Sequence, residues 1–121
     1  MPNEKSAVVL VVEDDPLVLL SAVDIIEEAG YLALQASDAD EAIAILEANP
    51  DINIVFTDIE MPGSMDGMKL AAFIRDRWPP VEIIITSGRV PAHDVTLPAR
   101  GVFLQKPYRP QELTEQLDRM V

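Results

Sequence analysis

The chain has 121 residues, of which 49% are hydrophobic and 25% charged, a balance that fits one globular domain and excludes a disordered chain. Acidic residues outnumber basic ones by 21 to 9, and the resulting net charge of −12 disfavours binding to nucleic acid and to anionic membranes. The sequence has no cysteine, which excludes disulfides, thiolate catalysis and cysteine-based zinc sites.

The N-terminal region predicts neither a signal peptide nor a membrane span. Only six apolar residues, Ala7 to Val12, precede Glu13, which is too short for a signal-peptide core and far too short to cross a bilayer. We therefore expect a cytoplasmic protein with one domain over residues 1–121, no output domain, and no membrane partner.

The first strand and helix are predicted from residues 7–29. The continuous apolar run 7–12 indicates a buried strand. Asp15-Pro16 then places an N-cap residue before a proline, and apolar residues recur at helical spacing until Gly30. We expect a helix over residues 16–29.

The second strand and helix lead to a third strand that ends in an acid. Residues 31–36 predict a short strand, and the N-cap and capping-box signals of 37–41 open a helix that Asn49-Pro50 ends. The apolar run 53–57 indicates a buried strand, and Asp58 follows it directly.

The second half of the chain continues the alternation. A helix is expected at residues 67–78, before the pair Pro79-Pro80, and a β-branched strand at 81–86. Residues 102–105 predict the last strand, and Pro110 opens the last helix. Strands that alternate with helices predict an α/β fold with a parallel sheet covered by helices on both faces.

Charged residues follow three of the predicted strands. Glu13 and Asp14 follow the first strand, Asp58 the third and Lys106 the fifth. Because the carboxyl ends of parallel strands meet at one edge, where open α/β sheets build their sites, these acids and the lysine are expected to lie together.

The chain resembles the receiver domain of two-component response regulators over essentially its whole length. The matching pieces, in order and spacing, are Val11 to Asp15, Asp58 with Met61-Pro62, Asp66-Gly67, Thr86 and Lys106-Pro107. The resemblance implies a five-stranded flavodoxin-like sheet of strand order 2-1-3-4-5. It also implies a cis peptide bond between Lys106 and Pro107.

The resemblance implies a role for each of these site residues. Asp58 would accept a phosphoryl group from a histidine kinase or histidine phosphotransfer protein. Lys106 would neutralise charge, the Thr86 hydroxyl would bond the phosphoryl group, and Phe103 would reorient as a switch. Ser87 is the alternative carrier of the hydroxyl, and simple core packing is the alternative role of Phe103.

The resemblance further implies a Mg²⁺ ion at the acidic cluster. Asp14 and Asp58 would be direct ligands, Glu13 would act through water, and the backbone carbonyl of Glu60 would complete the protein ligands. The physical reading agrees, because crowded carboxylates stay ionised most easily around a hard, oxygen-preferring cation. Asp15 and Asp66 are instead interpreted as helix caps.

Four functional hypotheses follow, of which the last, a receiver that binds partners without phosphorylation, is disfavoured by the intact set Glu13, Asp14, Asp58, Thr86 and Lys106. The first is a stand-alone receiver that signals to an unidentified output protein through phosphorylation-controlled contacts. The second is a receiver that belongs to a hybrid kinase or a longer regulator, which the run Thr86-Ser87-Gly88 favours. The third is a Mg²⁺-dependent phosphohydrolase that uses the same acidic site. Haloacid-dehalogenase-type phosphatases place two aspartates two residues apart after one strand, whereas here Glu60 stands two residues after Asp58, which disfavours this hypothesis.

The fourth helix of the family is predicted to be missing or reduced to about one turn. Pro91 and Pro98 leave only six residues between them, and an interior proline costs about 3 kcal/mol or more. Val95 and Thr96 are β-branched and add little helix propensity. We expect residues 88–100 to be the most mobile part of the domain.

Overall fold

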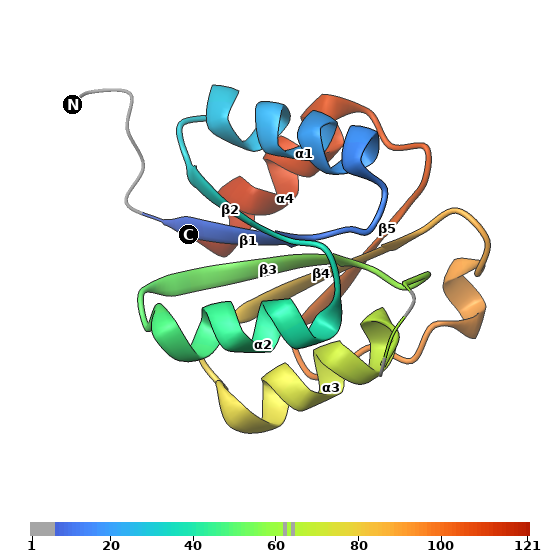
Figure 1. Cartoon of the computed structure of the whole chain (residues 1–121). Coiled ribbons are helices and arrows are strands. Elements are labelled where there is room, and N and C mark those ends of the chain that lie inside the picture. Colours follow the sequence, from blue (N-terminus) through green and yellow to red (C-terminus); the bar gives the residue numbers. More distant parts are fainter. Residues whose placement is uncertain (1–6, 62, 64) are drawn as a thin grey trace.

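The computed structural model describes residues 7–61, 63 and 65–121, and it contains a five-stranded parallel sheet in the order β2-β1-β3-β4-β5 (Figure 1). The strands are β1 (Val8–Val12), β2 (Leu32–Ala36), β3 (Ile52–Asp58), β4 (Glu82–Ser87) and β5 (Gly101–Gln105). The helices are α1 (Pro16–Glu28), α2 (Ala39–Ala48), α3 (Gly67–Arg77) and α4 (Pro110–Met120), with a 3-10 helix η1 (Ala92–Asp94). The predicted fold class and strand order are confirmed.

Helices cover both faces of the sheet, α2 and α3 on one and α1 and α4 on the other (Figure 1). Side chains of β1 alternate between the two cores: Leu10 packs towards α2 and α3, and Val9 towards α1 and α4. All five residues of β1 are buried, as the uninterrupted apolar run predicts for a central strand of a parallel sheet.

Three helices begin at an aspartate whose side chain accepts a backbone N–H bond. Asp15 accepts from Leu17 and Val18 at the start of α1, Asp38 caps α2, and Asp66 accepts from Lys69 at the start of α3. The helix-cap roles predicted for Asp15 and Asp66 are confirmed, and these bonds satisfy N–H groups that have no partner inside the helix.

The segment between β4 and β5 contains only the three-residue η1, so the predicted loss of the fourth helix is confirmed. Arg75 of α3 holds the far end of this segment, because its Nε donates to the carbonyl of Ala99 at 2.7 Å. Its Nη1 donates to the carbonyls of Pro79 and Val81 at 2.6 and 2.7 Å. Side-chain bonds from a neighbouring helix here replace the backbone bonds of a helix.

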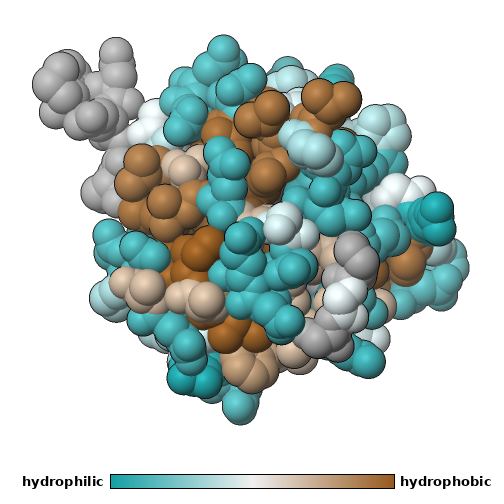
Figure 2. All heavy atoms as spheres, in the orientation of Figure 1, coloured by the Kyte–Doolittle hydropathy of each residue, from teal (hydrophilic) through white to brown (hydrophobic). Residues whose placement is uncertain are grey.

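The described helices are too short or too polar to cross a membrane. On the face drawn in Figure 2 hydrophilic side chains are interspersed with apolar ones, some of which lie over α1 and others towards β2 and α2. Leu17 and Leu20 of α1 are 78% and 52% exposed. Helix α1 therefore exposes two large apolar side chains.

Candidate functional site

Three carboxylates meet where β1 and β3 end. Glu13 follows β1 and Asp58 closes β3, and each is only 5% exposed, whereas Asp14 faces solvent. One carboxylate oxygen from each of the three lies within 4.8 Å of the others. The structure thus brings together the acids that the sequence predicts at this edge of the sheet.

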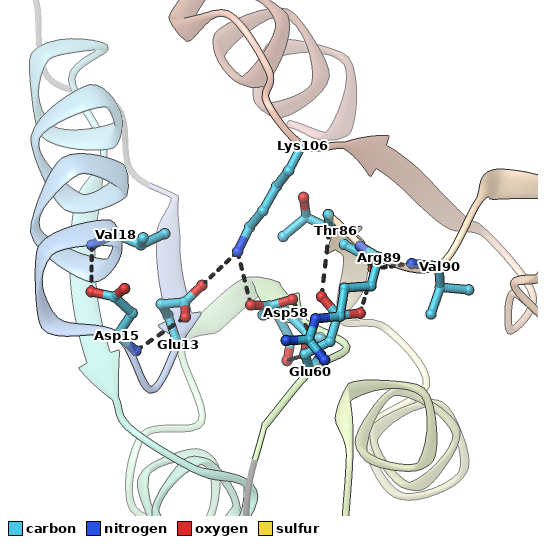
Figure 3. A network of polar contacts seen from close by, with 12 residues as sticks. Glu13, Asp15, Val18, Asp58, Glu60, Thr86, Arg89, Val90 and Lys106 are labelled. Carbon is cyan, nitrogen blue, oxygen red and sulfur yellow. Dashed lines mark hydrogen bonds and ion pairs between the residues drawn. The ribbon is translucent and has the colours of Figure 1, made fainter.

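Lys106 lies over this cluster and contacts two of its acids (Figure 3). Its Nζ donates to Asp58 Oδ2 at 2.8 Å and to Glu13 Oε1 at 3.1 Å. The backbone fixes the lysine in place, because the Lys106 N–H donates to the Ser87 carbonyl at 2.9 Å and extends the pairing of β5 with β4. The peptide bond that follows, Lys106-Pro107, is cis, as predicted.

The crowding of charge perturbs two of these groups. Burial raises the pKa of Glu13 from 4.5 to about 7, against the opposing hydrogen bonds from the Asp15 N–H and Lys106. Burial alone would lower the pKa of Lys106, but its bonds to Asp58 and Glu13 outweigh that effect and raise it. Lys106 is therefore a permanent cation between buried acids, and Glu13 exchanges its proton near neutral pH.

Of the two hydroxyls at the end of β4, the one on Thr86 shares a sheet face with Asp58. Thr86 pairs with Asp58 in the register of β3 and β4, so their side chains point to the same side. Its Oγ1 donates to the Leu104 carbonyl at 2.6 Å. The next residue, Ser87, points to the opposite side and donates instead to the Glu60 carboxylate.

Two further predicted residues flank the site. The Glu60 N–H donates to Asp58 Oδ1 at 3.3 Å, while its side chain reaches the end of β4. The sequence predicts a role only for the Glu60 carbonyl and gives no sign that the Glu60 side chain contacts Ser87 and Gly88. Phe103 pairs with Ile85 and packs half-buried on the core of α2 and α3, away from Asp58. Its switch role stays a prediction.

Gly67 allows α3 to begin directly against the end of β3. A Cβ built on Gly67 would lie 2.0 Å from the Asp58 carbonyl oxygen, a separation that no side chain tolerates. The Gly67 N–H also donates to the Ile59 carbonyl at 3.0 Å. Pro62, which belongs to the sequence motif between Asp58 and Gly67, lies outside the described residues.

The donors at the cluster fit a hard divalent cation. All three side chains offer carboxylate oxygens, and no nitrogen or sulfur ligand takes part in the group found among the described residues. Mg²⁺ and Ca²⁺ prefer such oxygen donors, and Mg²⁺ typically takes one or two carboxylates and keeps its waters. The cluster therefore suits Mg²⁺ better than zinc or copper.

An open groove of about 620 Å³ runs between α1 and the turn after β5 and reaches Lys106. Leu17, Val18 and Ser21 line it from α1, and Pro107 and Tyr108 line it from the turn. Its walls are mainly apolar, so the polar site lies beside a large apolar opening.

Comparison with known proteins identifies the family. Residues 9–118 match the family described as response regulator receiver domain. The chain belongs to this family. The strand order β2-β1-β3-β4-β5 agrees with the fold of this family.

Two curated relatives show how receivers of this kind occur. Sensor kinase CckA of Brucella abortus is 32% identical over 120 residues, which cover 96% of this chain and 13% of the relative. Nitrogen assimilation regulatory protein NtrX of Azorhizobium caulinodans is 34% identical over 109 residues, which cover 87% of this chain and 24% of the relative. The chain spans less than a quarter of the length of each.

Solved receiver structures share the fold along almost the whole chain. The receiver domain of the hybrid histidine kinase CckA superposes with a TM-score of 0.80 at 29% identity, covering 94% of this chain and 98% of that one. A receiver protein from Sinorhizobium medicae superposes with a TM-score of 0.86 at 24% identity, covering 96% and 94% of the two chains. The second likeness supports the fold alone.

Proposed function

We propose that Asp58 accepts a phosphoryl group from the phosphohistidine of a histidine kinase or phosphotransfer protein, and that the phosphorylated receiver signals through protein contacts. The observation that supports this most is the environment of Asp58. It is a buried carboxylate at a strand end, bonded to Lys106 and grouped with the oxygens of Glu13 and Asp14.

The chemistry assigned to the site is phosphoryl transfer between two nucleophiles. A carboxylate oxygen of Asp58 attacks phosphorus, the bond from phosphorus to the donor histidine nitrogen breaks, and that nitrogen keeps the electron pair. Lys106, already 2.8 Å from Asp58, neutralises charge on the acyl phosphate. A Mg²⁺ ion held by Glu13, Asp14, Asp58 and the Glu60 carbonyl would supply electrostatic stabilisation of the phosphoryl oxygens.

Phosphorylation is then read out through Thr86. In the unphosphorylated structure the Thr86 hydroxyl donates to the Leu104 carbonyl, and Thr86 lies on the same sheet face as Asp58. Exchange of that bond for one to the phosphoryl group would shift the end of β4 relative to β5, the strand that carries Phe103. Reorientation of Phe103 and altered contacts with an output protein would follow.

The similarity to CckA favours a second context for the same chemistry. That relative is a sensor kinase of which this chain matches 13%, so the receiver could act inside a phosphorelay that passes the phosphoryl group onward. The length of the native open reading frame separates this context from a stand-alone regulator.

Incubation with acetyl phosphate and Mg²⁺, followed by mass spectrometry, tests the proposal. We expect a single labile phosphoryl adduct on Asp58 that EDTA prevents and that Asp58→Asn abolishes without unfolding the protein. Asp76→Asn, which removes an exposed aspartate of α3, is the matched control and should keep the adduct. Phosphate on another residue, or steady turnover of phosphomonoesters without an adduct, would contradict the assignment.

A further inference from the structure

Ser87 joins the ends of three strands although the proposed chemistry gives it no part. Its side chain is fully buried, and its hydroxyl donates to Glu60 Oε2 while accepting from the N–H groups of Arg89 and Val90 at 3.1 and 2.9 Å. One donated and two accepted bonds use the full capacity of a hydroxyl. Ser87 therefore acts as a junction and not as a spare nucleophile.

Glu60 carries this junction to the acceptor. Its carboxylate accepts from Ser87 and, at 3.3 Å, from the Gly88 N–H, while its own N–H donates to Asp58 Oδ1 (Figure 3). One residue thus contacts Asp58 through its backbone and the loop after β4 through its side chain. A change in charge at Asp58 has a direct path to residues 88–90.

We propose that the Glu60–Ser87 contact is a latch that holds residues 88–90 against the end of β3 in the unphosphorylated protein and opens when Asp58 is phosphorylated. This inference rests on the function proposed above and assigns Ser87 as a positioning residue. A phosphoryl group brings a charge of about −2 onto the side chain whose Oδ1 accepts the Glu60 N–H, and so disturbs the residue whose carboxylate holds Ser87. Thr86 must also leave the Leu104 carbonyl, and its movement displaces the adjacent Ser87.

Opening the latch frees only one end of the segment that precedes β5. Arg75 still holds the far end through the Ala99 carbonyl. Val90 and Val95 pack on the same core as Phe103, so a segment released near the site and fixed at Ala99 uncovers that part of the core. The latch thereby links the acceptor to the surface around β5.

A latch that closes only in the unphosphorylated state must oppose phosphorylation, because an interaction confined to one state shifts the equilibrium towards it. Ser87→Ala removes the latch and keeps Thr86. Ser37→Ala is the matched control, since Ser37 Oγ also donates to a glutamate, Glu41, at 3.2 Å, but at the start of α2. Beryllofluoride with Mg²⁺ serves as the stable phosphoryl mimic.

Without ligand, we expect Ser87→Ala to speed hydrogen exchange of the amides of residues 89 and 90 about fivefold. We also expect it to tighten beryllofluoride binding about fivefold, because each factor corresponds to the free energy of about one hydrogen bond. The affinity for Mg²⁺ alone should stay unchanged. In the unmutated protein, saturating beryllofluoride should bring these two amides to the exchange rate of the variant, and Ser37→Ala should match the unmutated protein throughout.

Two results would overturn the latch while leaving phosphorylation intact. One is retained protection of amides 89 and 90 in the beryllofluoride complex of the unmutated protein. The other is beryllofluoride affinity that is unchanged or weaker in Ser87→Ala, since weaker binding would mean that Ser87 contacts the phosphoryl mimic. Failure of the unmutated protein to bind beryllofluoride would instead refute the proposed function itself.

Discussion

Replacement of Lys106 by methionine tests the charge balance of the site. Lys106 Nζ lies 2.8 Å from Asp58 and 3.1 Å from Glu13, two carboxylates whose side chains are 5% and 6% exposed. Methionine keeps much of the aliphatic chain and removes the cation, so two buried acids lose their hydrogen-bonded partner. We expect the free energy of unfolding without divalent metal to fall.

The size of the loss depends on pH. Removing one partner of a fully buried ion pair costs about 3–5 kcal/mol of stability. The Lys106 side chain is 23% exposed, so solvent screens its ion pairs and we expect a smaller loss of about 2 kcal/mol at pH 8. The pKa of Glu13 is already raised to about 7, and loss of the lysine raises it further. At pH 6 Glu13 is then mostly neutral in both proteins, and the loss shrinks to roughly 1 kcal/mol.

The direction of this dependence follows from proton binding. Between pH 4.5 and about 7, Glu13 holds its proton in the folded protein but has lost it in the unfolded chain. The stability that this group contributes is therefore fully present below pH 4.5 and is lost as the pH rises to about 7. In Lys106→Met the raised pKa extends that decline above pH 7. The mutant should therefore lose stability more steeply than the unmutated protein between pH 6 and pH 8.

Urea denaturation in EDTA at the two pH values, followed by Mg²⁺ titration, measures these effects. Mg²⁺ at 100 times the Kd of the unmutated protein adds about 2.7 kcal/mol to it, and at the same Mg²⁺ concentration the mutant should gain at least as much because no competing cation remains. Lys69→Met, at an exposed position of α3, is the control and should change little. Equal stability of Lys106→Met and the unmutated protein at pH 8 without metal, or poorer Mg²⁺ binding by the mutant, would refute the reasoning.

Other predictions concern the supports of the site. Gly67→Ala should cost about 3 kcal/mol in urea denaturation and abolish Asp58 phosphorylation, because its Cβ would meet the Asp58 carbonyl at 2.0 Å; Gly88→Ala, whose nearest neighbour lies 3.6 Å away, should cost far less. In hydrogen exchange, amides 88–100 should exchange faster than those of α1 and α3, and protection equal to these helices would contradict the expected mobility. Arg75→Met should speed exchange at residues 95–100 by about tenfold and leave α1 unchanged, since it removes the charged hydrogen bond to the Ala99 carbonyl.

The strand ends could be predicted because local chemistry and topology agree there. Five apolar residues before Glu13 and a buried run before Asp58 require strands, and parallel strands bring their carboxyl ends to one edge. The absence of the fourth helix could also be predicted from the sequence, since Pro91 and Pro98 leave no room for it between them. The predicted helices at 16–29 and 67–78 each end one residue earlier in the structure, as terminal residues often do.

Long-range side-chain contacts were not predictable in the same way. Nothing local to Arg75 indicates that it bonds the Ala99 carbonyl, 24 residues away, and the Glu60 side chain meets Ser87 only because β3 and β4 are neighbours. The exposure of Asp14 and the burial of Glu13 likewise could not be predicted from the sequence, since both residues follow the same strand. Such contacts depend on the register between neighbouring strands, which local sequence does not determine.

The loss of the fourth helix changes what can hold the segment between β4 and β5. A helix would satisfy its own backbone groups and move as a unit, whereas residues 88–100 rely on side chains at both ends, Glu60 and Ser87 near the site and Arg75 far from it. The near end depends on Glu60, whose N–H donates to Asp58, and the far end does not. A charge added to Asp58 should therefore act on the two ends unequally, which gives this receiver a local response in place of the displacement of a rigid helix.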